Sequence, residues 1–299
     1  MSTVFFIRFI EQKQHPWLIA FFNWVPAILL AYIVPAGLAG VLQKDFSSSE
    51  IHTLSKALFI PLAIVAVMSS LSLPQLKSIG WKPILVFLSG SFWIAVFPIG
   101  LLFIFKKSAF VQDFIIQQEF WKGIPPVVGS WIGGSTSQLV LKELVACSEA
   151  VFLTILVLDN ILVNLWTIFM FQSIKKSNFL NRLLRIDGRS PLEAVHTDKE
   201  NKMNPLLSFI ILLGAVVGAH FFIPSFVVKI ICLSFVGIAL SNLIKNWNFG
   251  FVLKLGGVLI LIVMAVLGLK LKFSLLQFDY LFMGFLVLWL VSHFVIMLG

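Results

Sequence analysis

Long apolar runs alternate with short polar segments along almost the whole of this chain. A helix that crosses a bilayer needs about twenty predominantly apolar residues. Runs of that kind predict helices near 22–42, 54–72, 83–105, 149–172, 205–222, 224–242, 250–271 and 279–298. The fold class that this pattern indicates is an all-α integral membrane protein with about eight transmembrane helices.

The segment 123–147 differs from these runs. It is apolar enough to enter a membrane, but prolines without an amide donor and glycines with a free backbone interrupt it, at Pro125, Pro126, Gly129, Gly133 and Gly134. We therefore expect one discontinuous helix here, which either crosses the membrane or re-enters on the side where it began.

The main polar break is the segment 173–204, with seven lysines and arginines. Such loops stay on the cytoplasmic side, so we expect a cytoplasmic loop between a first transmembrane bundle, 1–172, and a second, 205–299. The other charges leave both arrangements of 123–147 open. Five lysines of the first bundle depend on this choice: Lys44, Lys56, Lys106, Lys107 and Lys122. They lie on the cytoplasmic side if the segment crosses, and on the other side of the membrane if it re-enters.

Composition supports a membrane protein. The chain is 59% hydrophobic and 12% charged, with a mean hydropathy of +1.01, whereas soluble domains are about a quarter charged. The formal charge of +9 lies mostly in loops, so the expected partner is the lipid bilayer and not nucleic acid. Cys147 and Cys232 are the two cysteines, and they do not form a disulfide framework.

Polar residues and glycines gather between Trp121 and Trp166. Lipid tolerates such a stretch only where it faces protein or a water-filled cavity, which makes it the candidate site. Packing of small residues between helices is the alternative for the glycines and serines, but it does not account for the charges and amides. The expected substrate- or ion-binding residues are Gly129, Ser130, Gly133, Gly134, Ser135, Thr136, Ser137, Gln138, Lys142, Glu143, Asp159, Asn160 and Asn164.

A broken helix exposes carbonyl groups at one end of the break and amide groups at the other. These carbonyls, with the side chains of Ser135, Thr136, Ser137 and Gln138, form an oxygen-rich environment that suits Na⁺. The amide end suits a carboxylate of a substrate. No cofactor is expected besides a Na⁺ ion.

Asp159 lies deep in the predicted helix 149–172. A carboxylate in hydrocarbon favours binding a proton or a cation, so we expect Asp159 to couple ions. A salt bridge to Lys142 or a hydrogen bond to an amide of the broken helix is the structural alternative. We expect Glu143 to face the cavity, without forming a simple helical pair with Lys142, and Glu149 to be a solvated charge at the helix end.

Three parts of the chain resemble the YjcL-like family, a set of multi-pass membrane proteins distantly related to bile acid/sodium symporters and cation/proton antiporters. They are VPAILLAYIVPAGL at 25–38, GSWIGGSTSQ at 129–138 with Lys142 and Glu143 behind it, and DN followed by VNLW within 159–166. Ser137 stands where relatives usually carry Asn. The resemblance implies a transporter fold of two inverted repeats, each with a discontinuous helix. The two broken helices are expected to cross each other near the membrane centre, with substrate or ion sites beside that crossing. Against that pattern the chain resembles a member shortened at both ends, with a partial repeat fold.

The function expected from these features is secondary active transport of a small organic solute coupled to Na⁺ or H⁺. The alternative is a non-transporting membrane subunit or an inactive truncated product, and a second copy or another chain would then complete the site. An enzyme is not expected, because the sequence lacks a Gly-x-Ser-Gly nucleophile, a second deep aspartate and an HExxH motif. The resemblance places the protein in the bacterial inner membrane.

Overall fold

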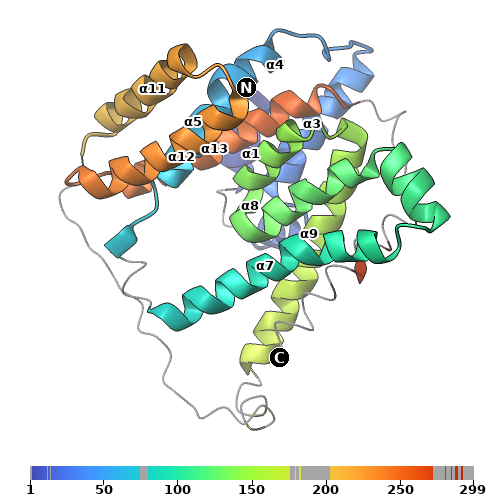
Figure 1. The fold of residues 1–299 in the computed structure, drawn as a ribbon. Helices are drawn as coiled ribbons and strands as arrows, with labels where there is room; N and C mark the ends of the chain where they lie inside the picture. The colour runs from blue at the N-terminus through green and yellow to red at the C-terminus, as the bar shows by residue number, and fades with distance from the viewer. Residues whose placement is uncertain are drawn as a thin grey trace.

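The structure is a computed structural model that describes residues 2–11, 13, 15–74, 80–175, 179, 182, 203–271, 280, 284, 287, 288 and 291. Every element in these residues is a helix (Figure 1). In the first half the elements are α1 (Ser2–Glu11), α2 (Pro16–Trp24), α3 (Ala27–Val41), α4 (Ile51–Leu54), the π-helical η1 (Ser55–Phe59), α5 (Ile60–Met68) and α7 (Trp81–Ile104). They continue with π-helical η2 (Phe110–Gln117), 3₁₀-helical η3 (Phe120–Gly123), α8 (Ile124–Leu144), α9 (Glu149–Lys175), α11 (Pro205–Phe222), α12 (Phe226–Leu243) and α13 (Phe249–Gly268).

Five helical stretches in the described residues are long and apolar enough to cross a membrane: Ile51–Met68, Trp81–Ile104, Pro205–Phe222, Phe226–Leu243 and Phe249–Gly268. An all-helical, multi-pass architecture is therefore confirmed. The predicted helix 279–298 and most of the loop 173–204 lie outside the residues that the structure describes.

The helix predicted near 22–42 is divided in two, which corrects the expectation of one continuous run. α2 ends before Val25, and α3 begins after Pro26. Val25 has φ −121° and ψ 85°, because the proline ring that follows it disfavours helical backbone at the preceding residue.

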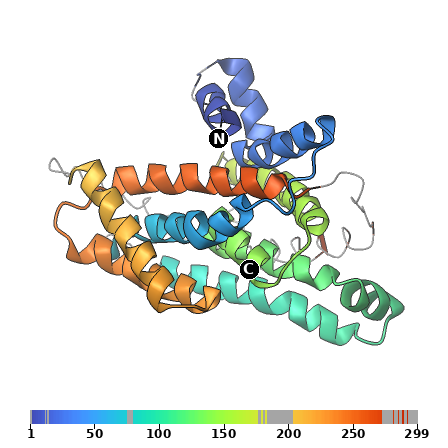
Figure 2. The ribbon, with the colours of Figure 1, turned by 90° about the horizontal axis from the view of Figure 1, so that it is seen from above.

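The core is built around α13, which packs on α3 and α5 (Figure 2). Small residues allow these contacts: a Cβ at Gly256 would stand 2.7 Å from a methyl group of Val67, and one at Gly268 would overlap the carbonyl group of Tyr32. Close approach at glycine is how apolar helices associate without a hydrophobic driving force. Helices from before and after the basic loop therefore share one core.

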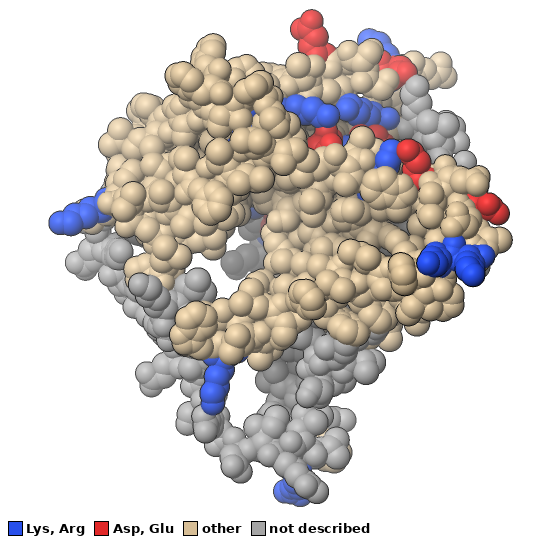
Figure 3. Space-filling model, viewed as in Figure 1, with Lys and Arg blue, Asp and Glu red and all other residues tan. Residues whose placement is uncertain are grey.

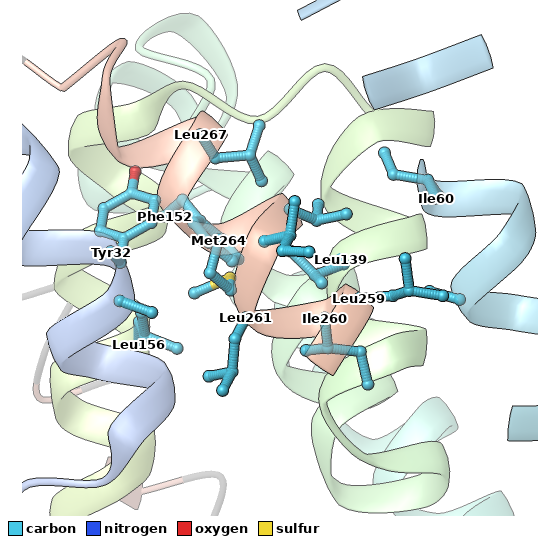
Figure 4. Close-up of a cluster of buried hydrophobic side chains, with 14 of the residues drawn as sticks. Tyr32, Ile60, Leu139, Phe152, Leu156, Leu259, Ile260, Leu261, Met264 and Leu267 are labelled. Atoms are coloured by element: carbon cyan, nitrogen blue, oxygen red, sulfur yellow. The ribbon is translucent and has the colours of Figure 1, made fainter. Parts of the chain in front are cut away.

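Side chains of five helices meet at this core (Figure 4). Met264 of α13 lies between Tyr32 of α3, Phe152 of α9 and Leu139 of α8, and all four side chains are buried. On the N-terminal side α1 packs on α3. The outer faces remain apolar: most of the surface in Figure 3 carries neither acidic nor basic side chains, and Phe222 is 86% exposed. Such a surface suits a lipid environment.

Candidate functional site

The helix α8 is broken at Gly134. This residue has φ 74° and ψ −169°, a conformation that residues with a side chain rarely adopt. The two prolines do not cause the break, because Pro125 and Pro126 occupy the first turn of α8, where a missing amide donor costs little. The discontinuity expected from the sequence is therefore present, and one glycine produces it.

The chain reverses direction at this break. A Cβ at Gly129 would stand 2.7 Å from Leu141 Cδ1 and 3.0 Å from the backbone of Ser137. In a straight helix Gly129 and Leu141 would be about 18 Å apart. The halves 124–133 and 135–144 thus lie side by side as a hairpin, and each is about 15 Å long, half the thickness of a bilayer core. Of the two arrangements expected for 123–147, crossing and re-entrant, this geometry fits the re-entrant hairpin.

An ion pair supports the same arrangement independently. Lys56 Nζ lies 2.7 Å from Glu143 Oε2. A crossing segment would place Lys56 and Glu143 on opposite sides of the membrane, whereas a re-entrant segment places them on the same side. Two distant parts of the chain therefore agree on the re-entrant form.

The carboxylate of Asp159 joins the two halves of the hairpin. From the first half, the Ser130 hydroxyl donates to Oδ2 over 2.6 Å and the Trp131 indole N–H donates to Oδ1 over 2.6 Å. From the second half, the Gln138 amide donates to Oδ2 over 3.3 Å. Asp159 is only 6% exposed, so these hydrogen bonds replace water around its charge.

The three donors differ in what else they can do. An indole N–H only donates, whereas a hydroxyl and an amide can also present an oxygen. Trp131 can therefore only donate to Oδ1, while Ser130 and Gln138 can turn oxygen atoms toward a cation placed beside Oδ2. No ion pair to Asp159 occurs in the described part of the chain. The arrangement can thus bind either a proton or a small hard cation at one oxygen.

The salt bridge between Lys142 and Asp159, which was the structural alternative for Asp159, is not formed. The ammonium group of Lys142 lies 2.6 Å from Glu149 Oε1 and 3.0 Å from Glu143 Oε1. Glu149 also accepts a 2.7 Å hydrogen bond from the hydroxyl of Tyr32. We call these residues, together with Lys56, the Lys142 network.

This network corrects two expectations. Glu149 is not a solvated end charge, because its side chain is largely buried and paired. Lys142 and Glu143 do pair although they are neighbours in sequence, since the long lysine side chain bends at the end of α8 to reach both carboxylates. Glu143 is saturated by two lysines, which leaves it without a free oxygen for an ion beside Asp159.

The remaining candidate residues lie at or near the break. Ser135, Thr136 and Ser137 are partly buried, and a Cβ at Gly133 would overlap Ser137. Close packing of the hairpin halves therefore explains Gly129 and Gly133. This agrees with the alternative interpretation, in which the glycines serve helix packing. Asn160 donates to the Leu156 carbonyl of its own helix over 2.8 Å, which turns it away from Asp159. The side chain of Asn164 lies outside the described part of the structure.

Three participants were missed at the level of sequence: Trp131, Tyr32 and Lys56. Signals for two of them exist. Trp131 follows Ser130 directly inside the polar stretch, and Tyr32 is one of two tyrosines in a chain with 31 phenylalanines, so its hydroxyl stands out. The sequence marks Lys56 only as a basic residue near a loop, and its partner Glu143 becomes visible only in the fold.

A cavity of about 190 Å³ adjoins the hairpin on the side of α7. Trp131 and Trp166 line it, together with Phe87, Gly90 and Ser91. Its wall is mainly apolar with one hydroxyl, and it contains the indole ring whose N–H is bonded to Asp159. A molecule in this cavity would touch the aspartate's fixed donor.

Neither the curated proteins nor the solved structures contain a match to this chain. One family model, described as "Protein of unknown function (DUF819)", matches residues 3–299. Because this match covers nearly the whole chain, the protein belongs to the DUF819 family.

Proposed function

We propose that this protein is a secondary active transporter that couples the movement of a small organic solute to Na⁺ or H⁺ at Asp159. One observation carries the proposal: a buried carboxylate is held by side chains from both halves of a re-entrant hairpin. An ionisable group at such a position in a membrane protein usually belongs to an ion or substrate path.

The coupling step follows from the donors around Asp159. Without a cation, Ser130 and Gln138 donate to Oδ2. When a cation arrives at Oδ2, the hydroxyl hydrogen turns away and the amide of Gln138 reverses, so that both present oxygen. Because Ser130 and Gln138 lie on different halves of the hairpin, the bound cation changes how the halves are held together.

The solute site that we propose is the cavity beside Trp131. Its two indole rings and apolar wall suit a small solute with an apolar or aromatic part, and Ser91 supplies a polar contact. A solute there presses on the ring of Trp131, whose N–H holds Asp159 Oδ1. Solute and cation thereby act on the same carboxylate from two sides.

The wider setting belongs to the same proposal. The resemblance to symporters and antiporters supports about eight spans, a partial inverted-repeat fold and a place in the bacterial inner membrane. The outer apolar faces of α7, α11 and α12 contact the lipid bilayer.

Ligand-dependent stability tests the proposal without knowledge of the solute. The purified protein is unfolded thermally in NaCl and in choline chloride of equal ionic strength, over a series of pH values. A cation at 100 times its dissociation constant stabilises the folded state by about 2.7 kcal/mol. We expect stabilisation by Na⁺, or by acid if the coupling ion is H⁺, and we expect Asp159→Asn to remove it.

Asp113→Asn is the matched control, because it makes the same chemical change at an exposed carboxylate. It should leave the cation effect intact. If the wild-type protein responds to neither cation, the transporter proposal is wrong, and a non-transporting membrane subunit becomes the better account.

A further inference from the structure

The Lys142 network and Asp159 lie at different depths. Glu149 and Asp159 are both on α9, ten positions apart, which is about 15 Å along a helix. That is half of the roughly 30 Å hydrocarbon thickness. The proposed function sets Asp159 near the membrane centre, which puts the network at one membrane surface, and the half-exposed side chain of Lys56 (53%) agrees with this position.

Every charge in the network is paired. The series runs from Lys56 at the surface through Glu143 and Lys142 to Glu149, which Tyr32 completes. Two lysines balance two glutamates. Removing one partner from a buried set of this kind leaves an uncompensated charge, which is strongly unfavourable. The ion pairs of the network are therefore expected to break or re-form together.

The network also ties four elements together: α3, η1, α8 and α9. On α8, Lys142 follows Gln138 by four positions, so the two side chains share a face of the second hairpin half. A displacement of that half moves the partner of Asp159 and the centre of the network at the same time.

We infer that the Lys142 network is a gate, which seals the surface end of the path to Asp159 while Lys142 is bound to Glu149 and Glu143. This inference rests on the proposed transport function, since a gate requires a path. Opening separates the second half of the hairpin from α9 and α3. Because Lys142 and Gln138 move together, cation binding at Asp159 biases the gate.

The element that carries Lys56 is suited to such a change. Lys56 lies in the π-helical turn η1, a form that is rare and frequently found at functional sites. Conversion to an α-helical turn shifts the register by one residue, which rotates Lys56 by about 100° and away from Glu143. Near Lys56, the buried atoms Ser55 Oγ of η1 and His52 Nδ1 of the preceding helix α4 have no hydrogen-bond partner in the described structure, so water entering an opened gate would satisfy them.

A native cysteine reports on the gate. The backbone N–H of Cys147 donates to the Lys142 carbonyl over 3.0 Å, and its side chain is buried. With Cys232→Ser as the background, Cys147 is the single thiol. The measurement is the rate at which a charged, membrane-impermeant methanethiosulfonate modifies Cys147 in reconstituted protein, well below the melting temperature.

Lys142→Met should raise this rate at least tenfold, because it removes the cation that holds both carboxylates. Exchange of the pair, Lys142→Glu with Glu149→Lys, should return the rate toward that of the background protein, which mere loosening of the fold would not do. Lys106→Met is the control at an exposed lysine, and it should leave the rate unchanged. If Lys142→Met does not fold, Lys56→Gln tests the same gate from its half-exposed end.

Folded Lys142→Met or Lys56→Gln protein that is modified at the background rate would overturn the gate. The test is separable from that of the proposed function. A gate that fails here leaves cation-dependent stability at Asp159 untouched. Absence of any cation effect would instead refute the transport proposal, whatever the modification rates.

Discussion

The indole N–H of Trp131 points at Asp159 Oδ1 over 2.6 Å and ties the first half of the α8 hairpin to α9. The same ring lines the cavity beside α7. Trp131 is therefore the physical link between a buried carboxylate and the space available for a solute.

Trp131→Phe keeps an aromatic ring in the cavity and removes the N–H together with part of the indole ring. A hydrogen bond to a charged group contributes about 1.5–3 kcal/mol, so the variant should unfold at a lower temperature in cation-free buffer. Trp81→Phe makes the same change at an exposed tryptophan and should be nearly neutral. Equal melting temperatures for Trp131→Phe and wild type would show that this hydrogen bond does not hold Asp159.

Gly134→Ala should destabilise the protein through the backbone alone. The residue has φ +74°, and a Cβ there would meet no atom within 4 Å, so a steric clash is not involved. Strain of this kind costs about 1–3 kcal/mol. Gly100→Ala lies inside α7, also without neighbours within 4 Å, and should be neutral or slightly stabilising. The comparison uses thermal unfolding of both variants, and a Gly134→Ala protein as stable as Gly100→Ala would argue against the break.

The sidedness of two exposed positions distinguishes a re-entrant hairpin from a crossing helix. Gln118 precedes α8 and Ser148 follows it, and both are exposed. In a cysteine-free background, Gln118→Cys and Ser148→Cys should react with an impermeant maleimide from the same side of sealed vesicles. Labelling from opposite sides would restore the crossing interpretation.

The pH dependence of Cys147 modification follows from its burial, which raises the pKa of the thiol to about 12. Only the thiolate reacts, and its fraction grows tenfold per pH unit below the pKa. With Cys232→Ser, the rate should therefore still be rising steeply between pH 8 and pH 10, where an ordinary thiol with a pKa of about 8.5 levels off. A plateau near pH 9 in folded protein would show that Cys147 is solvated.

Much of the fold is local and could be predicted. Apolar runs of the required length mark α7, α11, α12 and α13, and the glycine cluster marks the break in α8. The division at Pro26 was also readable, because a proline disfavours helix at the residue before it. These features depend on neighbours in sequence.

The site could be predicted only in part, because its contacts join distant residues. The polar stretch pointed to Ser130, Gln138 and Asp159, and the structure brings their side chains together. The fold-back that brings Gly129 against Leu141 depends on the direction of the chain after Gly134, which glycine's freedom leaves undetermined. The partner of Lys142 was equally open, since several carboxylates lie within reach of a long side chain.

Equilibrium binding of ²²Na⁺ to the purified protein tests the central claim most directly, with wild type, Asp159→Asn and Asp113→Asn measured side by side over a range of pH. The account predicts saturable binding to wild type and Asp113→Asn that weakens as protons compete at low pH, and none to Asp159→Asn. If protons alone occupy the site, ²²Na⁺ does not bind, and wild type but not Asp159→Asn takes up a proton with a matching change in stability. Saturable binding that survives in Asp159→Asn, or a wild-type protein that binds neither cation, would contradict the assignment of Asp159 as the coupling residue.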